Sequence, residues 1–329
     1  MKKDFRTLVC VAALIGAMTT GISYALDVST ELLIDNTTET YNETVSIIAP
    51  DGKISTTESG ILNVNGTLNN GNLIDNNGQI TGSTLQNETN AVINGNGQLS
   101  FGSGENKGSI TQDIIAITDS TGTFTNSGNI TSNTFNNSAK ILGDGSLEIS
   151  GGTNSNDITQ GTVTINGDYT NNGTITAANL NNNSKLTGSG SLTISDGTND
   201  GTIEQDNITI NNEFTNNNKI TVSNTLTNNK TFNNNNSAIT NKLENAAGST
   251  IAGNGSLTFG SGKNEGSIIQ DIIAITDSNG TFTNSGNITS NTFNNSAKIL
   301  GDGSLEISGG TNSNDITQGT VTINGDYTN

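Results

Sequence analysis

The feature that most constrains this chain is a short motif, N-x-[GN]-x-[IL], that returns along most of its length. Asn and Gly accept left-handed backbone, and the Asn side chain also bonds to its own backbone, so the start of the motif is typical of a turn. The β-branched residue at its end favours a strand. With looser variants ending at Ile141 and Leu186, the interval between successive closing apolar residues is most often 17, with shorter steps of 11 or 12. The clear copies span residues 76–80, 106–110, 126–130, 154–158, 171–175, 199–203, 216–220 and 264–268.

Two longer repeats enclose this motif. The pattern G-x-G-[SQ]-L-x-[IF] begins at Gly95, Gly143, Gly188, Gly253 and Gly301. Residues 101–171 and 259–329 align without gaps at an offset of 158, and only four positions differ: Glu105/Lys263, Lys107/Glu265, Thr111/Ile269 and Thr121/Asn279. Two of these exchange a Glu-x-Lys for a Lys-x-Glu, which moves charge without changing its sum and is typical of a solvated face.

A unit of one turn and one short strand cannot bury its apolar side alone and must stack on its neighbours. Hairpins are possible locally, but the constant return to one turn favours coils that wind in a single direction. The sequence therefore predicts an all-β fold, a right-handed parallel β-helix (β-solenoid) built from Asn/Gly-rich repeats. At roughly 20 residues per coil, residues 61–329 would form about 13 coils. The steps of 11 would be single sides of larger coils.

Inside such a solenoid, apolar side chains should form columns along the axis and turn Asn residues should stack into amide ladders. The period-2 pattern predicts which side chains point inward. They include Leu147, Ile149, Val163 and Ile165, with their equivalents Leu305, Ile307, Val321 and Ile323.

Three segments are expected along the chain. Residues 1–25 combine Lys2, Lys3 and Arg6, an apolar run too short to cross a bilayer and small residues near Ala25, which predicts a cleaved signal peptide rather than an N-terminal anchor. Residues 26–60 lack the Asn turn and are expected to form an N-terminal cap. Residues 61–329 are the β-solenoid repeats, which we expect to be truncated mid-repeat at Asn329.

Composition excludes several partners. Without residues 1–25 the chain has no His, Cys, Trp or Arg, and 9 Lys face 29 Asp and Glu, a net charge of −20. Such an acidic surface repels nucleic acid and anionic lipid. Disorder is the alternative for a polar, charged chain, but regularly spaced Ile, Leu, Val and Phe argue against it.

One stretch is similar to a known family. The run Gly143-x-Gly145-Ser146-Leu147-x-Ile149, followed by Asn154 and the alternating residues 161–165, resembles the autotransporter-associated β-strand repeat. The resemblance implies an autotransporter-type (type V secreted) adhesin passenger at the cell surface, on the outer membrane or outside the cell. Membrane attachment would then require a region beyond Asn329. Filamentous-haemagglutinin-type secreted adhesins are also similar.

Residues that could carry chemistry are few. Ser146 lies in a Gly-Asp-Gly-Ser run, but a serine nucleophile needs a base, and no His is present. The carboxylates Asp113, Asp119, Asp144, Glu148, Asp157 and Asp168 each have an equivalent at an offset of 158, so none marks a unique site. The calcium-binding nonapeptide is incomplete, and no Lys-[Ser/Thr] follows the Gly-rich segments. We therefore expect no catalytic, cofactor-binding or metal-binding residues.

These patterns predict a non-catalytic, adhesin-like structural or binding passenger. Its partners would be host or matrix glycans or proteins, or neighbouring cells. Two alternatives remain open. A polysaccharide-degrading β-helix enzyme would use carboxylates outside the duplicated copies, of which Glu204 and Asp206 are the nearest candidates. A pure spacer or surface-coat protein would bind nothing.

Overall fold

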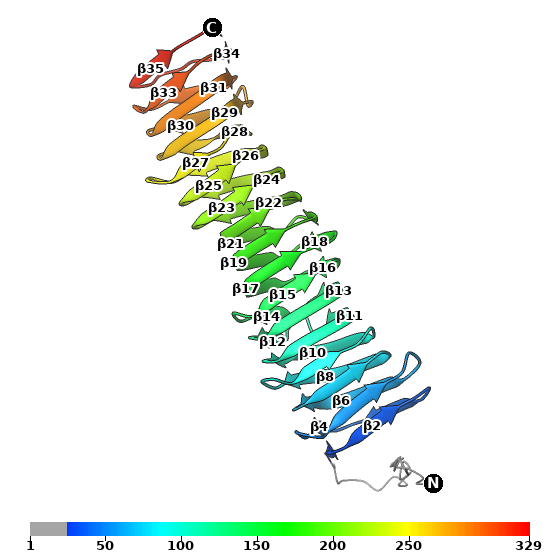
Figure 1. Ribbon diagram of the computed structural model, residues 1–329. Helices are drawn as coiled ribbons and strands as arrows, with labels where there is room; N and C mark the ends of the chain where they lie inside the picture. Colours follow the sequence, from blue (N-terminus) through cyan, green and yellow to red (C-terminus); the bar gives the residue numbers. More distant parts are fainter. Residues whose placement is uncertain (1–24) are drawn as a thin grey trace, which may run out of the picture.

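The computed structural model describes residues 25–329, and the strands within that range pair in parallel with strands one turn earlier or later along the chain. The chain winds into a single rod, and the strand labels rise from β2 at one end to β35 at the other (Figure 1). The predicted all-β parallel solenoid is confirmed. The predicted signal peptide falls outside the described residues, apart from Ala25, and stays a prediction.

The first third of the rod is made of β1 (Leu26–Val28), β2 (Glu31–Ile34), β3 (Thr38–Tyr41), β4 (Val45–Ile47), β5 (Lys53–Thr56), β6 (Ile61–Asn70), β7 (Leu73–Asn76), β8 (Gln79–Asn87), β9 (Val92–Asn94), β10 (Gln98–Asn106), β11 (Ser109–Ile117) and β12 (Thr123–Asn126). The middle is made of β13 (Asn129–Asn137), β14 (Lys140–Leu142), β15 (Ser146–Ile149), β16 (Gly152–Asn154), β17 (Asp157–Ile165), β18 (Tyr169–Asn171), β19 (Thr174–Asn182), β20 (Lys185–Thr187), β21 (Ser191–Asn199), β22 (Thr202–Ile210), β23 (Glu213–Asn216) and β24 (Lys219–Asn228). The last third is made of β25 (Thr231–Asn234), β26 (Ser237–Asn245), β27 (Thr250–Ala252), β28 (Ser256–Asn264), β29 (Ser267–Ile275), β30 (Thr281–Asn284), β31 (Asn287–Asn295), β32 (Lys298–Leu300), β33 (Ser304–Ile307), β34 (Gly310–Asn312), β35 (Thr320–Ile323) and β36 (Tyr327–Thr328).

The pairing registers divide each turn into three sides. In one turn, residues 174–177 form a side that we call face A, residues 179–182 form face B, and β20 forms face C. A long strand such as β19 runs along two faces and bends at the corner between them, where Ala178 is left out of the pairing with β17 and β21. The rod therefore has three outward faces, each a parallel ladder of short segments.

The turns are shorter than expected. Starting at Leu26, partners on face A lie on successive turns up to Ile316, which is reached in sixteen steps. The expected count of about 13 turns for residues 61–329, which came from the assumed coil length, is too low, because Leu62 connects to Tyr327 through sixteen levels. The corners need fewer residues than we assumed.

The three repeat lengths now have one geometric meaning. A step of 17 is one turn on the same face, as from Asn137 to Asn154 on face C. A step of 11 covers two of the three sides, as from Ile130 on face B to Ile141 on face A, so it is not a single side of a larger coil. The offset of 158 is nine complete turns, and Gly143 and Gly301 both lie on face A. Duplication therefore kept every residue on its original face.

The interior contains the apolar columns that alternation predicts. Leu147, Ile149, Val163 and Ile165 are at most 2 % exposed, and so are Leu305 and Ile307. Val321 and Ile323 are paired in register with Leu305 and Ile307, but they are 45 % and 49 % exposed because they lie on the last turn that the structure describes.

Buried Asn side chains stack beside these columns. Within a ladder, the amide nitrogen of one Asn donates to the amide oxygen of the Asn one turn later, at 2.7–2.8 Å. The last Asn of such a ladder donates to a Gln two turns later. The predicted Asn ladders are thus confirmed, and they run inside the rod. Four of them pass through Asn70, Asn87, Asn106, Asn126 and Gln160 on face A; Asn137, Asn154, Asn171 and Gln205 on face C; Asn182, Asn199, Asn216, Asn234 and Gln270 on face B; and Asn228, Asn245, Asn264, Asn284 and Gln318 on face A. Shorter ones join Asn76 to Gln112 on face B and Asn295 to Asn312 on face C.

Residues 26–60 form the first turns of the same solenoid. β1, β2 and β3 pair in parallel with β4, β5 and β6. Ile34, Val45 and Ile54 continue the apolar columns. A capping role for this segment stays a prediction.

Replacing Ile165 with Asp should lower the free energy of unfolding by about 3 kcal/mol or more, because it removes buried apolar surface and places a carboxylate in a dry column. Thr164→Asp is the matched control, since the neighbouring side chain points outward. Chemical denaturation of both variants measures the difference. Equal stability would contradict the face assignment.

Removing residues 101–258, which is nine whole turns, should leave a folded rod about 43 Å shorter. Ser100 would then precede Phe259, as Thr258 does now, and every later residue would keep its face. Removing residues 101–250 is the control, because it joins a strand on face C to one on face B. Circular dichroism and small-angle scattering should show a cooperative, shortened rod for the first deletion only.

Candidate functional site

The G-x-G motif recurs five times along the chain, and the structure assigns it to the ladders. Gly143 occupies the ladder position between Asn126 and Gln160. Because Gly143 has no side chain, the amide nitrogen of Asn126 reaches past it to Oε1 of Gln160 at 2.6 Å. The Gln160 amide nitrogen also lies 3.5 Å from the Gly143 carbonyl oxygen. The motif therefore marks a turn that has no ladder side chain. The last Asn of the ladder bonds across this turn to a Gln, and the ladder ends there.

The same arrangement occurs at the other four copies. The first Gly of each copy has φ between +118° and +125°, and a Gln occupies the same column one turn later. The Gln that accepts the crossing bond is Gln112, Gln205, Gln270 or Gln318. The constant Gly-to-Gln spacing was the sequence signal that could have revealed this role.

Ser146 is part of the same repeating frame. Its hydroxyl donates to the side-chain oxygen of Asn129 one turn earlier at 2.6 Å, and Ser304 does the same to Asn287 at 2.7 Å. No base contacts either hydroxyl among the described residues. Both serines act as turn-to-turn links.

The six repeated carboxylates lie outside the core and apart from one another. Glu148 accepts from the Asn166 amide at 2.8 Å and Asp113 from the Asn133 amide at 2.8 Å. Asp119 accepts from the backbone and hydroxyl of Thr121, which lowers the pKa of its carboxyl. A lowered pKa keeps the group ionised, which is the opposite of what a general acid needs. Asp144, Asp157 and Asp168 are also exposed.

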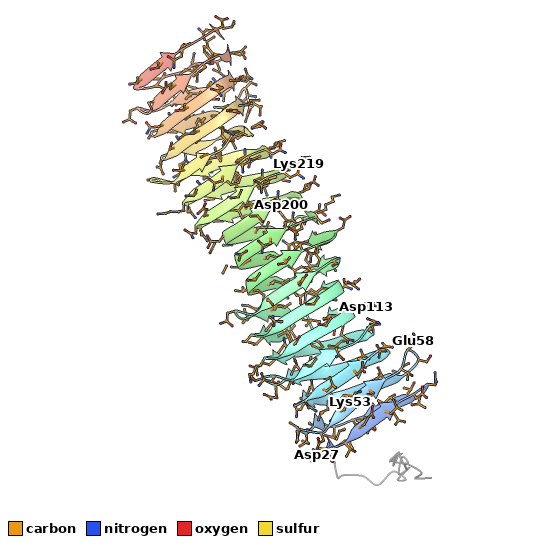
Figure 2. The ribbon with its side chains drawn as sticks, viewed as in Figure 1. Asp27, Lys53, Glu58, Asp113, Asp200 and Lys219 are labelled. Atoms are coloured by element: carbon orange, nitrogen blue, oxygen red, sulfur yellow. The ribbon has the colours of Figure 1, made fainter. Side chains whose placement is uncertain are left out.

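Glu204 and Asp206, the candidates outside the duplicated copies, are not drawn into a cleft. Glu204 points outward from face C and lies 3.9 Å from the Lys219 ammonium on the next turn. Asp206 lies at the following corner, where only its backbone nitrogen is bonded, to the Gly190 carbonyl at 3.0 Å. Figure 2 shows that the labelled charged residues, including Asp113, Asp200 and Lys219, are spread along the rod.

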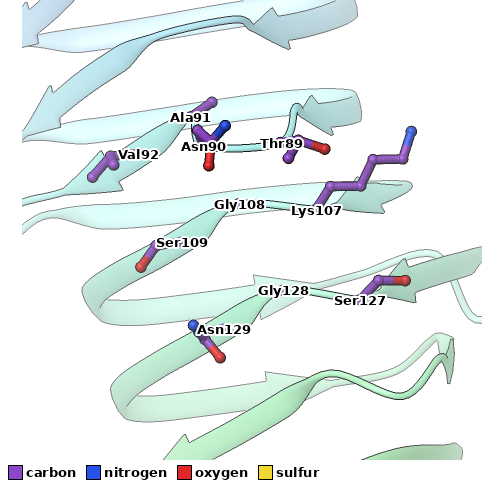
Figure 3. Close-up of a pocket in the computed structure, with 10 residues that line it drawn as sticks. All are labelled: Thr89, Asn90, Ala91, Val92, Lys107, Gly108, Ser109, Ser127, Gly128 and Asn129. Atoms are coloured by element: carbon purple, nitrogen blue, oxygen red, sulfur yellow. The ribbon is translucent and has the colours of Figure 1, made fainter.

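The surface has a shallow, open depression at the corner between faces A and B (Figure 3). It forms where the loop at Thr89 and Asn90 projects beside the side-chain-free Gly108 and Gly128. Lys107 is its only charged lining residue, and the equivalent position in the second copy is Glu265. No carboxylate therefore lines the depression, and the position of its one charged residue holds the opposite charge in the second copy.

The exchanged charges behave as a solvated pair. The Lys107 ammonium lies 2.8 Å from the Glu105 carboxylate, which raises the pKa of Lys107. In the second copy the pair is reversed, and Lys263 lies 3.2 Å from Glu265. Both pairs are partly exposed, so each contributes little to stability.

Within residues 25–329, no group of three or more His, Cys, Asp or Glu side chains is placed to hold a metal ion. The same part of the chain contains no helix suited to spanning a membrane. Comparison with protein-family models, curated proteins and solved structures gave no match.

Gly188→Ala should be strongly destabilising, by about 2–4 kcal/mol, because the added Cβ would meet the Asn171 carbonyl oxygen at 2.2 Å and push the ladder apart. Gly248→Ala is the control, since Gly248 also has positive φ (+74°) but has nothing within 4 Å of an added Cβ. It should cost only about 1 kcal/mol. Thermal unfolding of the two variants separates backbone strain from close contact. Equal losses would contradict the ladder-crossing role.

Proposed function

We propose that this chain is an exported, non-catalytic rod that works as an adhesin-like passenger at the cell surface or outside the cell. The observation that carries the proposal is the repetition of outward chemistry. Ser, Thr and Asn recur on successive turns of all three faces, whereas the acidic candidates lie singly and none sits with a base in the described depression. A catalytic site is assembled once, but a repeated face offers the same contact many times.

A rigid solenoid suits summed weak contacts. Its backbone is paired on both sides in most turns, so little conformational entropy is lost when a ligand lies along it. Each outward hydroxyl or amide contributes a small net free energy, and many of them on one rod give avidity. Glycans or matrix proteins with repeating polar groups are the partners that fit this surface.

The export route rests on sequence. The predicted signal peptide and the resemblance of residues 143–165 to the autotransporter-associated β-strand repeat support a type V secreted passenger. After residue 25 the chain has no Cys and is strongly acidic, which suits a protein outside the cell, because the charge keeps long β-rods soluble and discourages edge-to-edge pairing.

The experiment compares the full chain with the 101–258 deletion on arrays of neutral and acidic glycans and matrix proteins. If the contacts of repeated faces add up, the affinity of the shortened rod should fall by a much larger factor than its length does. If neither rod binds any ligand, the adhesin proposal is wrong, and a spacer or surface-coat role is favoured instead.

The enzyme alternative has its own readout. Incubation of the full chain with the same glycans should give no sustained release of shorter products. Turnover that disappears in the Glu204→Gln, Asp206→Asn double variant would overturn the non-catalytic proposal and identify those carboxylates as catalytic. This double variant should bind and unfold like the parent, because both side chains lie outside the core.

A further inference from the structure

Face A carries a regular array of threonine side chains on five successive turns. Thr159, Thr176, Thr193, Thr209 and Thr227 are partners in consecutive register. The neighbouring outward column on the same turns holds Asp157, Thr174, Ser191, Asn207 and Thr225. The pairing is continuous across this stretch of face A, because the register shift lies at the corner between faces C and A, where β24 has Ser223 and Asn224 and β22 has only Asp206.

The hydroxyls of the array are free. In the part of the chain that the structure describes, the only side-chain hydrogen bond within the two columns joins the Asn207 amide to the Ser191 hydroxyl at 3.4 Å. Some outward hydroxyls on other faces do bond to a neighbouring turn, as Thr81 does to Asn63 and Ser146 to Asn129. The array threonines thus present their hydroxyl and methyl groups to solvent.

The array also lacks charge on its inner turns. Between Thr174 and Thr227, face A presents no ionisable side chain, and the next turn begins with the ion pair of Lys242 and Glu244 at 2.7 Å. On comparable turns face B carries Asp196 and Glu213, and face C carries Lys185, Glu204 and Lys219. The uncharged strip is therefore a property of one face.

Its spacing is fixed in two directions. Successive turns of a parallel solenoid are about 4.8 Å apart, and alternate residues along one strand are about 6.6 Å apart. Threonine is β-branched and stiff about its first side-chain torsion, so packed neighbours hold each hydroxyl and methyl in place. The result is a rigid two-dimensional lattice of small polar and apolar groups.

We infer that this strip binds ice. Water oxygens on the surfaces of ice repeat at intervals close to those of the array, so waters held between its hydroxyls and methyls match a crystal plane. A charged group would impose its own hydration shell on those waters, and the strip has none on its inner turns. This inference does not depend on the proposed adhesin function.

An uncharged polysaccharide fits the strip less well. Sugar rings gain much of their affinity by stacking on exposed aromatic rings, and no outward aromatic side chain occurs in residues 25–329. The Phe residues in that range and Tyr169 are buried, while Tyr41 and Tyr327 pack against the core. Each hydroxyl-to-hydroxyl bond adds only a small net free energy, and a sugar chain lying on the strip would use only some of its groups. A lattice of water can instead use every group of the array at once.

The test is measurement of the gap between freezing and melting temperatures of a single ice crystal in a solution of the purified chain, together with crystal shape. The parent chain should produce a measurable gap and faceted growth. Thr193→Tyr, at the centre of the array, should reduce the gap several-fold. Thr198→Tyr is the matched control, because it places the same ring on face B in the same strand, and it should leave the gap unchanged.

Circular dichroism melting of both variants must match the parent, which excludes loss of fold as the cause. Absence of any gap or faceting in the parent overturns the inference, and so does an equal reduction in the two variants. If Thr193→Tyr instead weakens binding to a neutral polysaccharide while ice growth is unaffected by the parent, the strip is a glycan surface and the inference is wrong.

Discussion

The rod depends on one interaction, the hydrogen bond between the side-chain amides of buried Asn residues on successive turns. A buried amide must find both a donor and an acceptor, because an unpaired polar group in the core costs about 1–3 kcal/mol. Stacking identical residues in register meets this demand, since Asn199 accepts from Asn182 and donates to Asn216. A register slip by a single position would turn each amide outward and an outward polar residue inward. The ladders therefore determine the register of the apolar columns beside them.

The hydrogen bonds of a ladder all point the same way along the rod. Each Asn side chain donates to a residue on a later turn, so the side-chain oxygen of the first Asn in a ladder receives no hydrogen bond from an earlier Asn. Asn137 solves this with the backbone nitrogen of Ala139. Asn182 and Asn228 follow Ile165 and Ile210 on their columns, and their buried oxygens have no partner in the described residues. At the other end, a Gly and then a Gln close the ladder. The longer Gln side chain spans the turn that the Gly leaves open, and the column can then return to apolar residues.

Much of this architecture could be predicted from the sequence, because turn and strand chemistry is local. The motif Asn residues, such as Asn126 and Asn171, do stack, and Ile149 and Ile165 do point inward. The three-sided cross-section could not be predicted in the same way. The corner residues Ala178 and Asp206 share no residue type that would mark a bend. The average repeat length therefore did not show that strands such as β19 turn a corner. The role of Gln160 was missed for a different reason: its partner Asn126 lies two turns earlier in the chain. The short motifs do not show such a contact, although the constant interval from Gly143 to Gln160, repeated in every copy, points to it.

The inner and outer positions of the rod differ in how freely they can change, so a binding function would depend on the outer faces. Inside, ladder and column positions are constrained by pairing, so Ile165 or Gly188 has few acceptable replacements. Outside, alternate residues of each strand meet only solvent and their neighbours on adjacent turns, so a face can change chemistry without disturbing the core. The exchange of Glu105 and Lys107 for Lys263 and Glu265 is such a change, and both versions keep an ion pair. Duplication by nine whole turns then copies a face onto itself. A chain built this way can lengthen its outer faces without disturbing its core, which is the property that the proposed multivalent binding rod requires.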